Sequence, residues 1–174
     1  MSLDLSSAGG LDGALLRLAR TRGHHPAAER AVAAFSVLGE HGAIWLALGV
    51  LGALFCPGRR RAWMRASGVV GGVYLAGCLV KVAVRRPRPK IPDLPPLVPT
   101  PTQLSFPSAH ASTSFAAASQ YAALGLPAAP LYGVATALSL SRLYLGVHYP
   151  SDVVAGAAFG AAVGRRWRWR KNPR

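Results

Sequence analysis

Residues 63–84 read WMRASGVVGGVYLAGCLVKVAV, a run with only two charged side chains, Arg65 and Lys81. Its length and apolarity predict a helix that crosses a lipid bilayer, because about 20 residues at a helical rise span the hydrocarbon core. Small residues are frequent in the run, as is typical of membrane helices that pack closely against their neighbours. This stretch therefore predicts an all-α membrane protein.

Further apolar stretches lie on both sides of this run. We expect them to form spanning helices over about 28–56, 108–126, 128–147 and 150–167. Glu40 and His41 interrupt the first stretch, so it is interpreted as one span, a re-entrant element or two short helices. Residues 10–22 predict an amphipathic helix. The expected fold class is an all-α, polytopic membrane helix bundle of about five to six spanning helices, with an amphipathic N-terminal helix and a proline-rich outer loop.

The composition supports a membrane protein and disfavours a nucleic-acid-binding one. Only 15% of the 174 residues are charged, although the formal net charge is +14, and soluble domains carry about a quarter charged residues. A nucleic-acid-binding surface would interleave basic and polar residues along a soluble fold. Here the basic residues flank apolar stretches, as at a membrane surface. They are Arg59, Arg60, Arg61, Arg65, Arg165, Arg166, Arg168, Arg170 and Lys171.

The same charges predict how the chain is oriented in a cell membrane. The turn CPGRRRAWMR (56–65) and the tail RRWRWRKNPR (165–174) are expected on the cytoplasmic side. With alternating spans, the end of span 63–84, the start of 108–126, the end of 128–147 and the start of 150–167 all meet on the outer side. Five spans would put the arginines between Arg17 and Arg30 on the outer side, where positive charge is disfavoured. Six spans would resolve this conflict.

The connection over residues 85–107, RRPRPKIPDLPPLVPTPTQLSFP, contains eight prolines. Proline lacks a backbone donor and disfavours helix in the preceding residue, so we expect a stiff, extended segment. It is too polar to face lipid. We therefore place it over the outer mouth of the bundle, where it could cover a site.

The ionisable residues of the spans all fall at these outer ends. Charged groups inside spanning segments are costly and usually mark function. Lys81, Arg88 and Arg142 would supply three positive charges for a phosphate group, and arginine suits bidentate contact with it. The helix that opens at Ser108 would direct its N–H groups at the same anion.

Two histidines complete this expected cluster. His148 and Asp152 are four residues apart, so the carboxylate could hold one imidazole nitrogen and leave the other free as a nucleophile. His110 is then placed to protonate a leaving oxygen. Two histidines, three cations and no cluster of metal-ligating residues together predict phosphoryl transfer through a phosphohistidine, without a metal or other cofactor.

Three segments carry a family resemblance: KVAVRRPRP (81–89), PSAH (107–110) and SRLYLGVHYPSD (141–152). They resemble, in order, the signature motifs of the type-2 phosphatidic acid phosphatase (PAP2) superfamily. The resemblance covers about residues 63–165 of an expected single domain, 1–174. It implies His148 as nucleophile, Asp152 as its orienting carboxylate and His110 as general acid. It likewise implies a set of phosphate-binding residues: Lys81, Arg88, Ser108, Ala109 and Arg142. Alanine at 109 departs from the family's usual glycine.

We therefore expect a membrane enzyme that acts on a lipid phosphate, with no nucleic-acid partner and no particular oligomeric state indicated. The size and the alanine- and arginine-rich composition favour a polyprenyl-linked substrate. Undecaprenyl diphosphate, phosphatidic acid and phosphatidylglycerol phosphate stay open. A non-catalytic protein that binds anionic lipid or transports a phosphorylated solute is the alternative of another class. Outside the cluster, His41 is interpreted as structural. Arg85 and Arg86 are interpreted as interface charges, with contact to a second phosphate or a sugar as the alternative.

Overall fold

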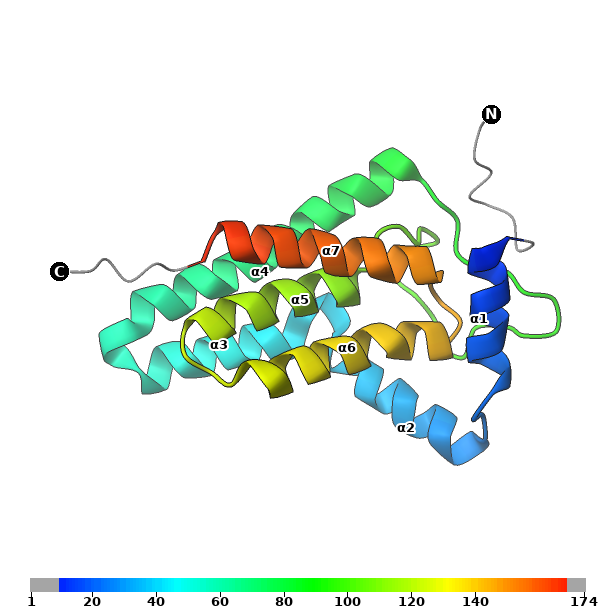
Figure 1. The fold of residues 1–174 in the computed structure, drawn as a ribbon, viewed down its shortest axis with the longest axis horizontal. Helices are drawn as coiled ribbons and strands as arrows, with labels where there is room; N and C mark the ends of the chain where they lie inside the picture. The colour runs from blue at the N-terminus through cyan, green and yellow to red at the C-terminus, as the bar shows by residue number, and fades with distance from the viewer. Residues whose placement is uncertain (1–9, 169–174) are drawn as a thin grey trace.

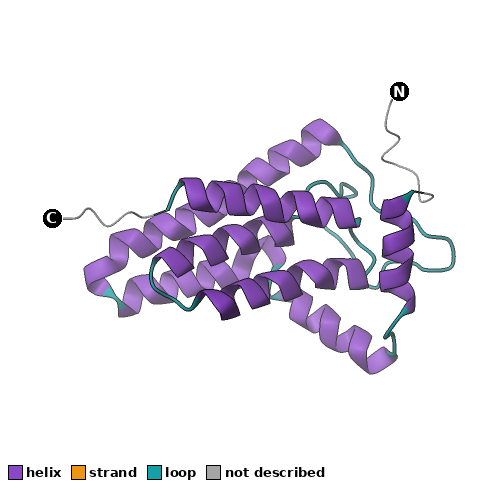
Figure 2. Cartoon of the chain, in the orientation of Figure 1, coloured by secondary structure: helices purple, strands orange, loops and turns teal. Residues whose placement is uncertain are grey.

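The computed structural model describes residues 10–168, and every regular element among them is a helix (Figures 1 and 2). The expected all-α class is confirmed for this part of the chain; the tail residues Arg170 and Lys171 lie outside it. The elements are α1 (Leu11–Thr21), α2 (Pro26–Val37), η1 (Glu40–Gly42), α3 (Ala43–Phe55), η2 (Pro57–Arg59), α4 (Arg60–Val84), α5 (Ala109–Ala123), α6 (Ala128–Tyr144) and α7 (Pro150–Arg166).

Helix α1 is amphipathic and lies across one end of the bundle (Figure 1). Leu16 and Arg20 are buried beneath it, whereas Leu11, Leu15 and Leu18 on the opposite face are exposed. The buried Arg20 guanidinium donates hydrogen bonds to two backbone carbonyls, those of Tyr144 (3.1 Å) and Pro95 (2.8 Å). Arg20 therefore joins α1 to the end of α6 and to the segment 85–107, and its charge does not indicate membrane sidedness.

The first apolar stretch is broken where Glu40 and His41 interrupt it. The short helix η1 separates α2 from α3, and the two helices are bent by 40°. His41 (φ 52°) and Gly42 (φ 74°) both adopt left-handed backbone conformations, which an α-helix cannot contain. The stretch is therefore not one continuous helix, and the bent pair corresponds to a broken span or a re-entrant element.

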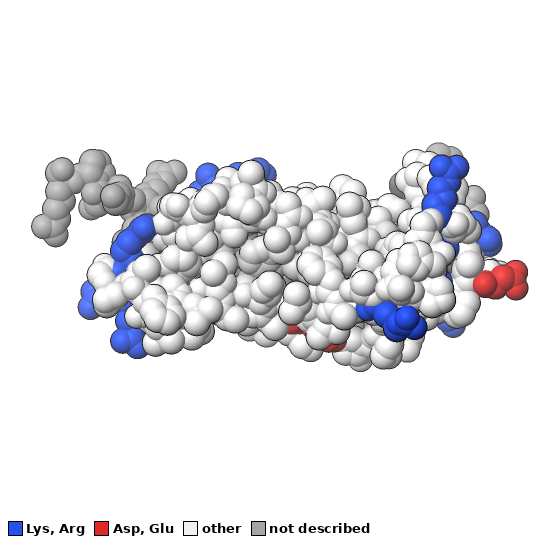
Figure 3. Space-filling model, turned by 90° about the horizontal axis from the view of Figure 1, so that it is seen from below, with Lys and Arg blue, Asp and Glu red and all other residues white. Residues whose placement is uncertain are grey.

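Length and hydropathy identify fewer spans than the five or six expected. Helix Pro57–Val84 is long and apolar enough to cross a bilayer, and α2 with α3 adds a second span if the bent pair counts as one. Helices α5, α6 and α7 have 15, 17 and 17 residues, which is short of the ~20 that a perpendicular crossing needs. On the face in Figure 3, Lys and Arg gather mainly toward the two ends, with a largely uncharged band between them.

Helix α5 occupies the centre of the bundle, and α7 packs closely against it (Figure 1). Gly156, Gly160 and Gly164 form the contact stripe on α7, one turn apart. A side chain at Gly160 would lie 2.0 Å from the Ser112 carbonyl oxygen, and one at Gly156 would lie 2.6 Å from that of Ser108. Because glycine has no side chain, the two backbones can touch. This contact fixes the depth of α5 beside α7.

An aromatic core holds the opposite half of the bundle together. The Trp63 and Tyr121 rings pack with their centroids 5.5 Å apart. Trp45 donates its indole N–H to the hydroxyl of Ser114 (2.8 Å), and Tyr121 donates its O–H to the Trp45 carbonyl (2.7 Å). The polar atoms of Trp45 and Tyr121 are thus hydrogen-bonded, as low-dielectric burial favours, whereas the Trp63 indole nitrogen is buried without a hydrogen-bond partner among the described residues.

The proline-rich connection 85–107 folds back over the end of the bundle, as expected. Pro87 and Leu104 form an antiparallel bridge, and the Ser105 N–H donates to the Arg86 carbonyl (2.9 Å). The Leu97 N–H also donates to the Leu145 carbonyl (3.0 Å) at the end of α6. The segment is consequently fixed at both its base and its middle.

Candidate active site

The four predicted helix ends meet at one end of the bundle, which we call the motif end: α4 and α6 end there, and α5 and α7 begin there (Figure 1). A cavity of about 100 Å³ lies between them. Six of the residues predicted for the site or its phosphate contacts line this cavity: Lys81, Arg88, Ala109, His110, Arg142 and His148. Ser108 and Asp152 are fully buried and contact the cavity-lining segments from behind.

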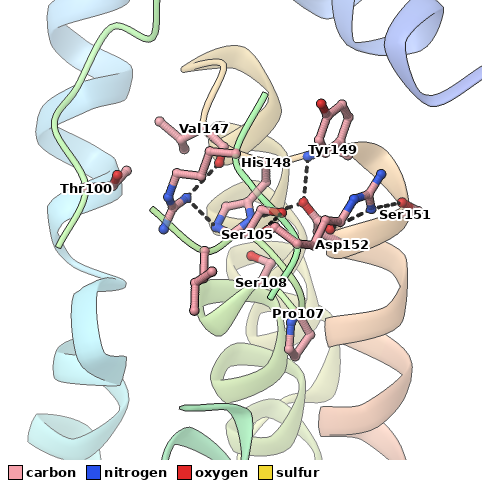
Figure 4. A network of polar contacts seen from close by, with 12 residues as sticks. Thr100, Ser105, Pro107, Ser108, Val147, His148, Tyr149, Ser151 and Asp152 are labelled. Carbon is pink, nitrogen blue, oxygen red and sulfur yellow. Dashed lines mark hydrogen bonds and ion pairs between the residues drawn. The ribbon is translucent and has the colours of Figure 1, made fainter. Parts of the chain in front are cut away.

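His148 lies in the turn between α6 and α7, with its Nε2 atom near a cation (Figure 4). Arg88 Nη1 donates to His148 Nε2 (3.2 Å). Because an arginine N–H can only donate, Nε2 is the acceptor and Nδ1 carries the proton. Burial, opposed by the neighbouring Asp152, lowers the pKa of His148 to about 3. The imidazole is therefore neutral near pH 7, with a lone pair on Nε2.

Asp152 stands behind the other nitrogen of this imidazole. Its Oδ2 atom lies 3.5 Å from His148 Nδ1, which is within ion-pair range but longer than a hydrogen bond, and Nδ1 has no hydrogen-bond partner among the described residues. The carboxylate is fully buried, and Oδ2 accepts from the Tyr149 N–H (2.9 Å). Asp152 is thus fixed at the first turn of α7, close enough to orient the imidazole.

Arg86 is buried, which makes the interpretation of this residue as an interface charge wrong. It is 7% exposed, and its guanidinium donates to Asp152 Oδ1 (2.8 Å) and to Asp12 Oδ2 (2.7 Å). It also stacks over the Tyr149 ring, 4.1 Å from the centroid. The sequence placed Arg86 next to the membrane surface, but the turn after α4 directs it inward, where two carboxylates balance its charge.

Asp12 was not singled out from the sequence, since a lone acidic residue near the start of a helix is unremarkable. Its carboxylate accepts from the N–H of Ser151 (2.9 Å), from the Ser151 hydroxyl and from Arg86. Partial burial opposes ionisation, but these hydrogen bonds keep the pKa of Asp12 below its usual value. Helix α1 is thereby connected through Arg86 to the carboxylate behind His148.

Neutral groups, rather than carboxylates, hold two of the three predicted phosphate-binding cations. Lys81 Nζ donates to the carbonyls of Ser105 (3.2 Å) and Pro107 (2.6 Å). Arg88 donates to the carbonyls of Thr102 and Val147, both at 2.7 Å. Burial lowers the pKa of Arg88 to about 10, so the guanidinium stays protonated near pH 7. Carbonyl contacts position these cations and leave their positive charge available to an anion.

Ser36 on α2 joins the third cation to the second histidine. Arg142 Nη1 donates to the Ser36 hydroxyl (2.6 Å), and His110 Nε2 is 2.9 Å from the Ser36 carbonyl oxygen. A carbonyl can only accept, so His110 carries a proton on Nε2. No feature of the sequence distinguishes Ser36 from other small residues of an apolar helix. Its position against both side chains follows from the packing of α2 on α6.

The start of α5 presents backbone and hydroxyl donors at the motif end. The Ser108 hydroxyl is buried without a hydrogen-bond partner among the described residues, whereas the Ser108 N–H already donates to the Asp152 carbonyl (3.0 Å). Ala109 begins the helix and is not among the residues with positive φ. Alanine is therefore compatible with this position, and the departure from glycine does not distort the helix start.

The cavity has a second wall that the sequence did not predict, formed by Glu40, His41 and Tyr74 together with Cys78. His41 Nδ1 lies 2.7 Å from the Tyr74 hydroxyl oxygen. The break between α2 and α3 carries His41 to the cavity, where its contact with Tyr74 is compatible with the interpretation of His41 as a hydrogen-bonded structural residue. Pro101 and Thr102 of the proline-rich segment also line the cavity, so this segment covers the site.

No group of three or more His, Cys, Asp or Glu side chains among residues 10–168 is arranged to hold a metal ion. What the cavity does contain is a neutral imidazole whose Nε2 lone pair accepts from Arg88, a carboxylate behind it, and cations held by neutral partners. This combination of groups is compatible with phosphoryl transfer to a histidine.

Comparison with known proteins agrees with that class. The sequence matches the PAP2 superfamily over residues 62–173, and the chain belongs to this superfamily of phosphatases. It is 48% identical over 130 residues to the decaprenylphosphoryl-5-phosphoribose phosphatase of Mycobacterium tuberculosis, covering 74% of this chain and 72% of the relative. The protein of the same name from Mycolicibacterium smegmatis is 42% identical over 148 residues, covering 84% of this chain and 81% of that one.

Solved structures share the fold. The crystal structure of Aquifex aeolicus LpxE superposes with a TM-score of 0.75 at 25% identity, covering 91% of this chain and 94% of that one. The transmembrane PAP2-type phosphatidylglycerolphosphate phosphatase from Bacillus subtilis gives a TM-score of 0.72 at 25% identity, covering 90% and 82%. These neighbours support membrane association of the present chain.

Proposed function

We propose that this protein, acting as one domain, removes a terminal phosphate from a polyprenyl-linked phosphosugar through a phosphohistidine, without a metal. The single observation that carries the proposal is the surroundings of His148. Its Nε2 lone pair is held toward Arg88 beside a small cavity, and Asp152 lies behind Nδ1. The names of the mycobacterial relatives favour the 5-phosphate of decaprenylphosphoryl-5-phosphoribose as the group removed, which is a case of the polyprenyl-linked substrate favoured from the sequence.

In the first step, His148 Nε2 attacks the phosphorus atom and the bond from phosphorus to the ester oxygen breaks. Lys81, Arg88 and Arg142 stabilise the negative charge on the other phosphate oxygens. The proton on Nδ1 stays near Asp152, whose carboxylate stabilises the imidazolium that forms. The Ser108 hydroxyl, which is buried and has no hydrogen-bond partner within residues 10–168, is a further donor to the phosphate.

His110 supplies the proton that the leaving oxygen needs. Its Nε2–H is donated to the Ser36 carbonyl in the structure. For the transfer His110 is an imidazolium, the leaving oxygen takes the place of that carbonyl as acceptor, and His110 becomes neutral when the proton moves. In the second step, water attacks the phosphohistidine and His110 accepts a proton from the water. The products are inorganic phosphate and the alcohol, and His148 returns to its neutral form.

The orientation that we propose places the motif end on the outer face of the cell membrane. The basic turn at residues 56–65 lies at the opposite end of the bundle, and positive charge is favoured on the cytoplasmic side. A lipid substrate would then enter sideways between helices, so that its tail stays in the bilayer. Shorter helices such as α5 would span in a multi-pass arrangement where the bilayer thins around the protein.

The test is phosphate release by the purified protein in detergent with excess chelator. The panel contains a polyprenyl-phosphoryl phosphosugar, undecaprenyl diphosphate, phosphatidic acid and phosphatidylglycerol phosphate. We expect chelator-resistant release that is fastest with the phosphosugar. Faster release from any other member would reassign the substrate. If no member is hydrolysed, the enzyme proposal fails in favour of lipid binding or transport, for which His148 would be dispensable.

A further inference from the structure

Two sets of residues line the cavity at the motif end, and we call them the cationic wall (Lys81, Arg88 and Arg142) and the polar wall (Glu40, His41 and Tyr74). Glu40 brings a carboxylate into the same space as the three cations. Negative charge beside a phosphate site is unfavourable unless it has another role. Among residues 10–168, no side chain or N–H is found to donate a hydrogen bond to the Glu40 carboxylate, although its charge acts on both Arg142 and Tyr74.

The size of the cavity decides which part of a substrate meets Glu40. Its volume of about 100 Å³ is well below the roughly 300–1,000 Å³ of pockets that enclose a whole drug-sized ligand, so it suits a group as small as a phosphate. The atoms that follow the ester oxygen must therefore lie at the rim of the cavity. Glu40 and Tyr74 are half-buried there and His41 is exposed. These three residues are accordingly placed to contact whatever group bears the phosphate.

His41 and Tyr74 add hydrogen-bonding groups of both kinds to this wall. The Nδ1 atom of His41 and the Tyr74 hydroxyl are 2.7 Å apart, and the two rings pack edge to face with centroids 5.4 Å apart. Whichever atom donates, the pair leaves a further donor and a further acceptor free. His41 is held at φ 52°, ψ 14°, a conformation that costs a non-glycine residue free energy and that often marks a functional position.

We propose that Glu40, His41 and Tyr74 form a hydroxyl-binding subsite that selects phosphate esters carrying free hydroxyl groups next to the ester, as in a sugar. The inference rests on the proposed phosphatase function. A carboxylate accepts strong hydrogen bonds from hydroxyl groups, and the phosphate itself is left to the cationic wall. Phosphatidic acid, whose neighbouring oxygens are acylated, would offer no hydroxyl donor to Glu40 and would leave the remaining donor and acceptor of the His41–Tyr74 pair unused. Unpaired polar groups of this kind can produce discrimination of several orders of magnitude.

The experiment compares two substrates that differ only in hydroxyl groups: a polyprenyl-phosphoryl phosphosugar and its dideoxy analogue, with the same lipid and the same terminal phosphate. The measured quantity is the ratio of kcat/KM for the two. We expect the wild type to prefer the hydroxylated substrate by at least about 10-fold. Glu40→Gln and Tyr74→Phe should each bring this ratio toward one. Tyr132→Phe is the matched control, because Tyr132 packs against Phe115 in the hydrophobic core, and it should keep the wild-type ratio.

His41 is replaced by Asn, which tolerates the left-handed backbone, so that the loss of the imidazole is separated from a backbone change. Melting temperatures in detergent confirm that each variant is folded. A wild-type ratio near one would overturn the subsite. A ratio that stays at the wild-type value while both rates fall would also overturn it, since Glu40 would then act only on the charge of Arg142. Absence of release from both substrates by the wild type would instead contradict the proposed function.

Discussion

Helices α5 and α7 meet in two regions that differ in chemistry. Along their length, glycines on α7 let the two backbones touch, with Gly160 against Ser112. At the motif end the same pair of helices is joined by polar contacts, including the Ser108 N–H to the Asp152 carbonyl. The glycine contact positions the helices, whereas the motif end contains the groups that we assign to catalysis.

The two regions depend on each other because Ser108 and Asp152 sit one turn beyond the glycine stripe. Any displacement of α7 against α5 would move Asp152 relative to His148. The motif end in turn contains costly features: buried charges, and a Ser108 hydroxyl without a partner among the described residues. Such features are tolerated because the close packing behind them holds the helices in place. Substitutions should therefore damage folding at the glycines and turnover at the motif end.

The largest effect is expected from Gly160→Val. Its side chain would have to occupy the position of the Ser112 backbone, 2.0 Å away, so the helices must separate, at a cost of about 4 kcal/mol or more. We expect loss of the folded protein in a detergent thermal-melt assay. Gly133→Ala on α6, where a side chain meets open space, is the matched control and should fold normally. A Gly160→Val protein of wild-type stability would refute the backbone contact.

The second-largest effect is a loss of turnover in a protein that still folds. His148→Ala removes the nucleophile, and kcat should fall by at least about 10⁴-fold, as for other nucleophiles that act as part of a unit. The melting temperature should change little compared with Gly160→Val. Phosphate release and covalent labelling with radioactive substrate are the measurements. Labelled protein from the Ala variant would assign the phosphoenzyme to another residue.

Comparing Arg86→Lys with Arg88→Lys distinguishes a residue that positions Asp152 from one that binds the substrate. Arg86 contacts Asp152 and Asp12 but does not line the cavity. Lysine keeps the charge but cannot bridge two carboxylates with a planar fork, so we expect kcat to fall about 10- to 100-fold with KM within about 3-fold. Arg88→Lys, which alters a cavity-lining cation, should raise KM as well. Equal changes in KM for the two variants would place Arg86 among the substrate contacts.

Lowering the pH should reduce the free energy of unfolding, because His148 is buried in its neutral form. In the unfolded chain the imidazole takes up a proton below about pH 6.5, but in the folded protein its pKa is lowered to about 3. The unfolded state therefore binds more protons between these values, so the stabilisation is complete above pH 6.5 and declines as the pH falls toward 3.

Between pH 7 and pH 5, the wild type should lose about 2 kcal/mol more free energy of unfolding than His148→Asn, which has no proton to bind. Chemical unfolding in detergent at the two pH values measures the difference. Parallel declines for the two proteins would show that the His148 imidazole is already protonated or solvated in the folded state.

The smallest effect is expected from Ala109→Gly, which restores the residue usual in the family. Ala109 already has a helical backbone at the start of α5, so kcat/KM should change by less than about 3-fold, and stability should fall by about 0.5–1 kcal/mol through the greater backbone freedom of glycine. Enzyme assays and thermal melts would check both values. A gain in rate of 10-fold or more would mean that alanine misdirects the first N–H groups of the helix.

The sequence by itself determined the helical class and the approximate helix positions. Apolar runs and prolines are local features, and the break at Glu40 and His41 could be anticipated because polar residues interrupt an apolar run there. The convergence of Lys81, His110, Arg142 and His148 also followed from the alternating direction of successive helices. Each of these conclusions needs only the order of residues along the chain.

Only the tertiary structure decided which groups touch one another. Arg86 differs from its exposed neighbour Arg85 by one position, yet it is buried between Asp12 and Asp152. Ser36 carries no distinguishing pattern, and Glu40 marks only a break in an apolar run. Both reach the site because the bend between α2 and α3 turns toward α5 and α6. These contacts join residues far apart in the chain, and the direction of each side chain depends on helix packing and on turns that local composition does not encode.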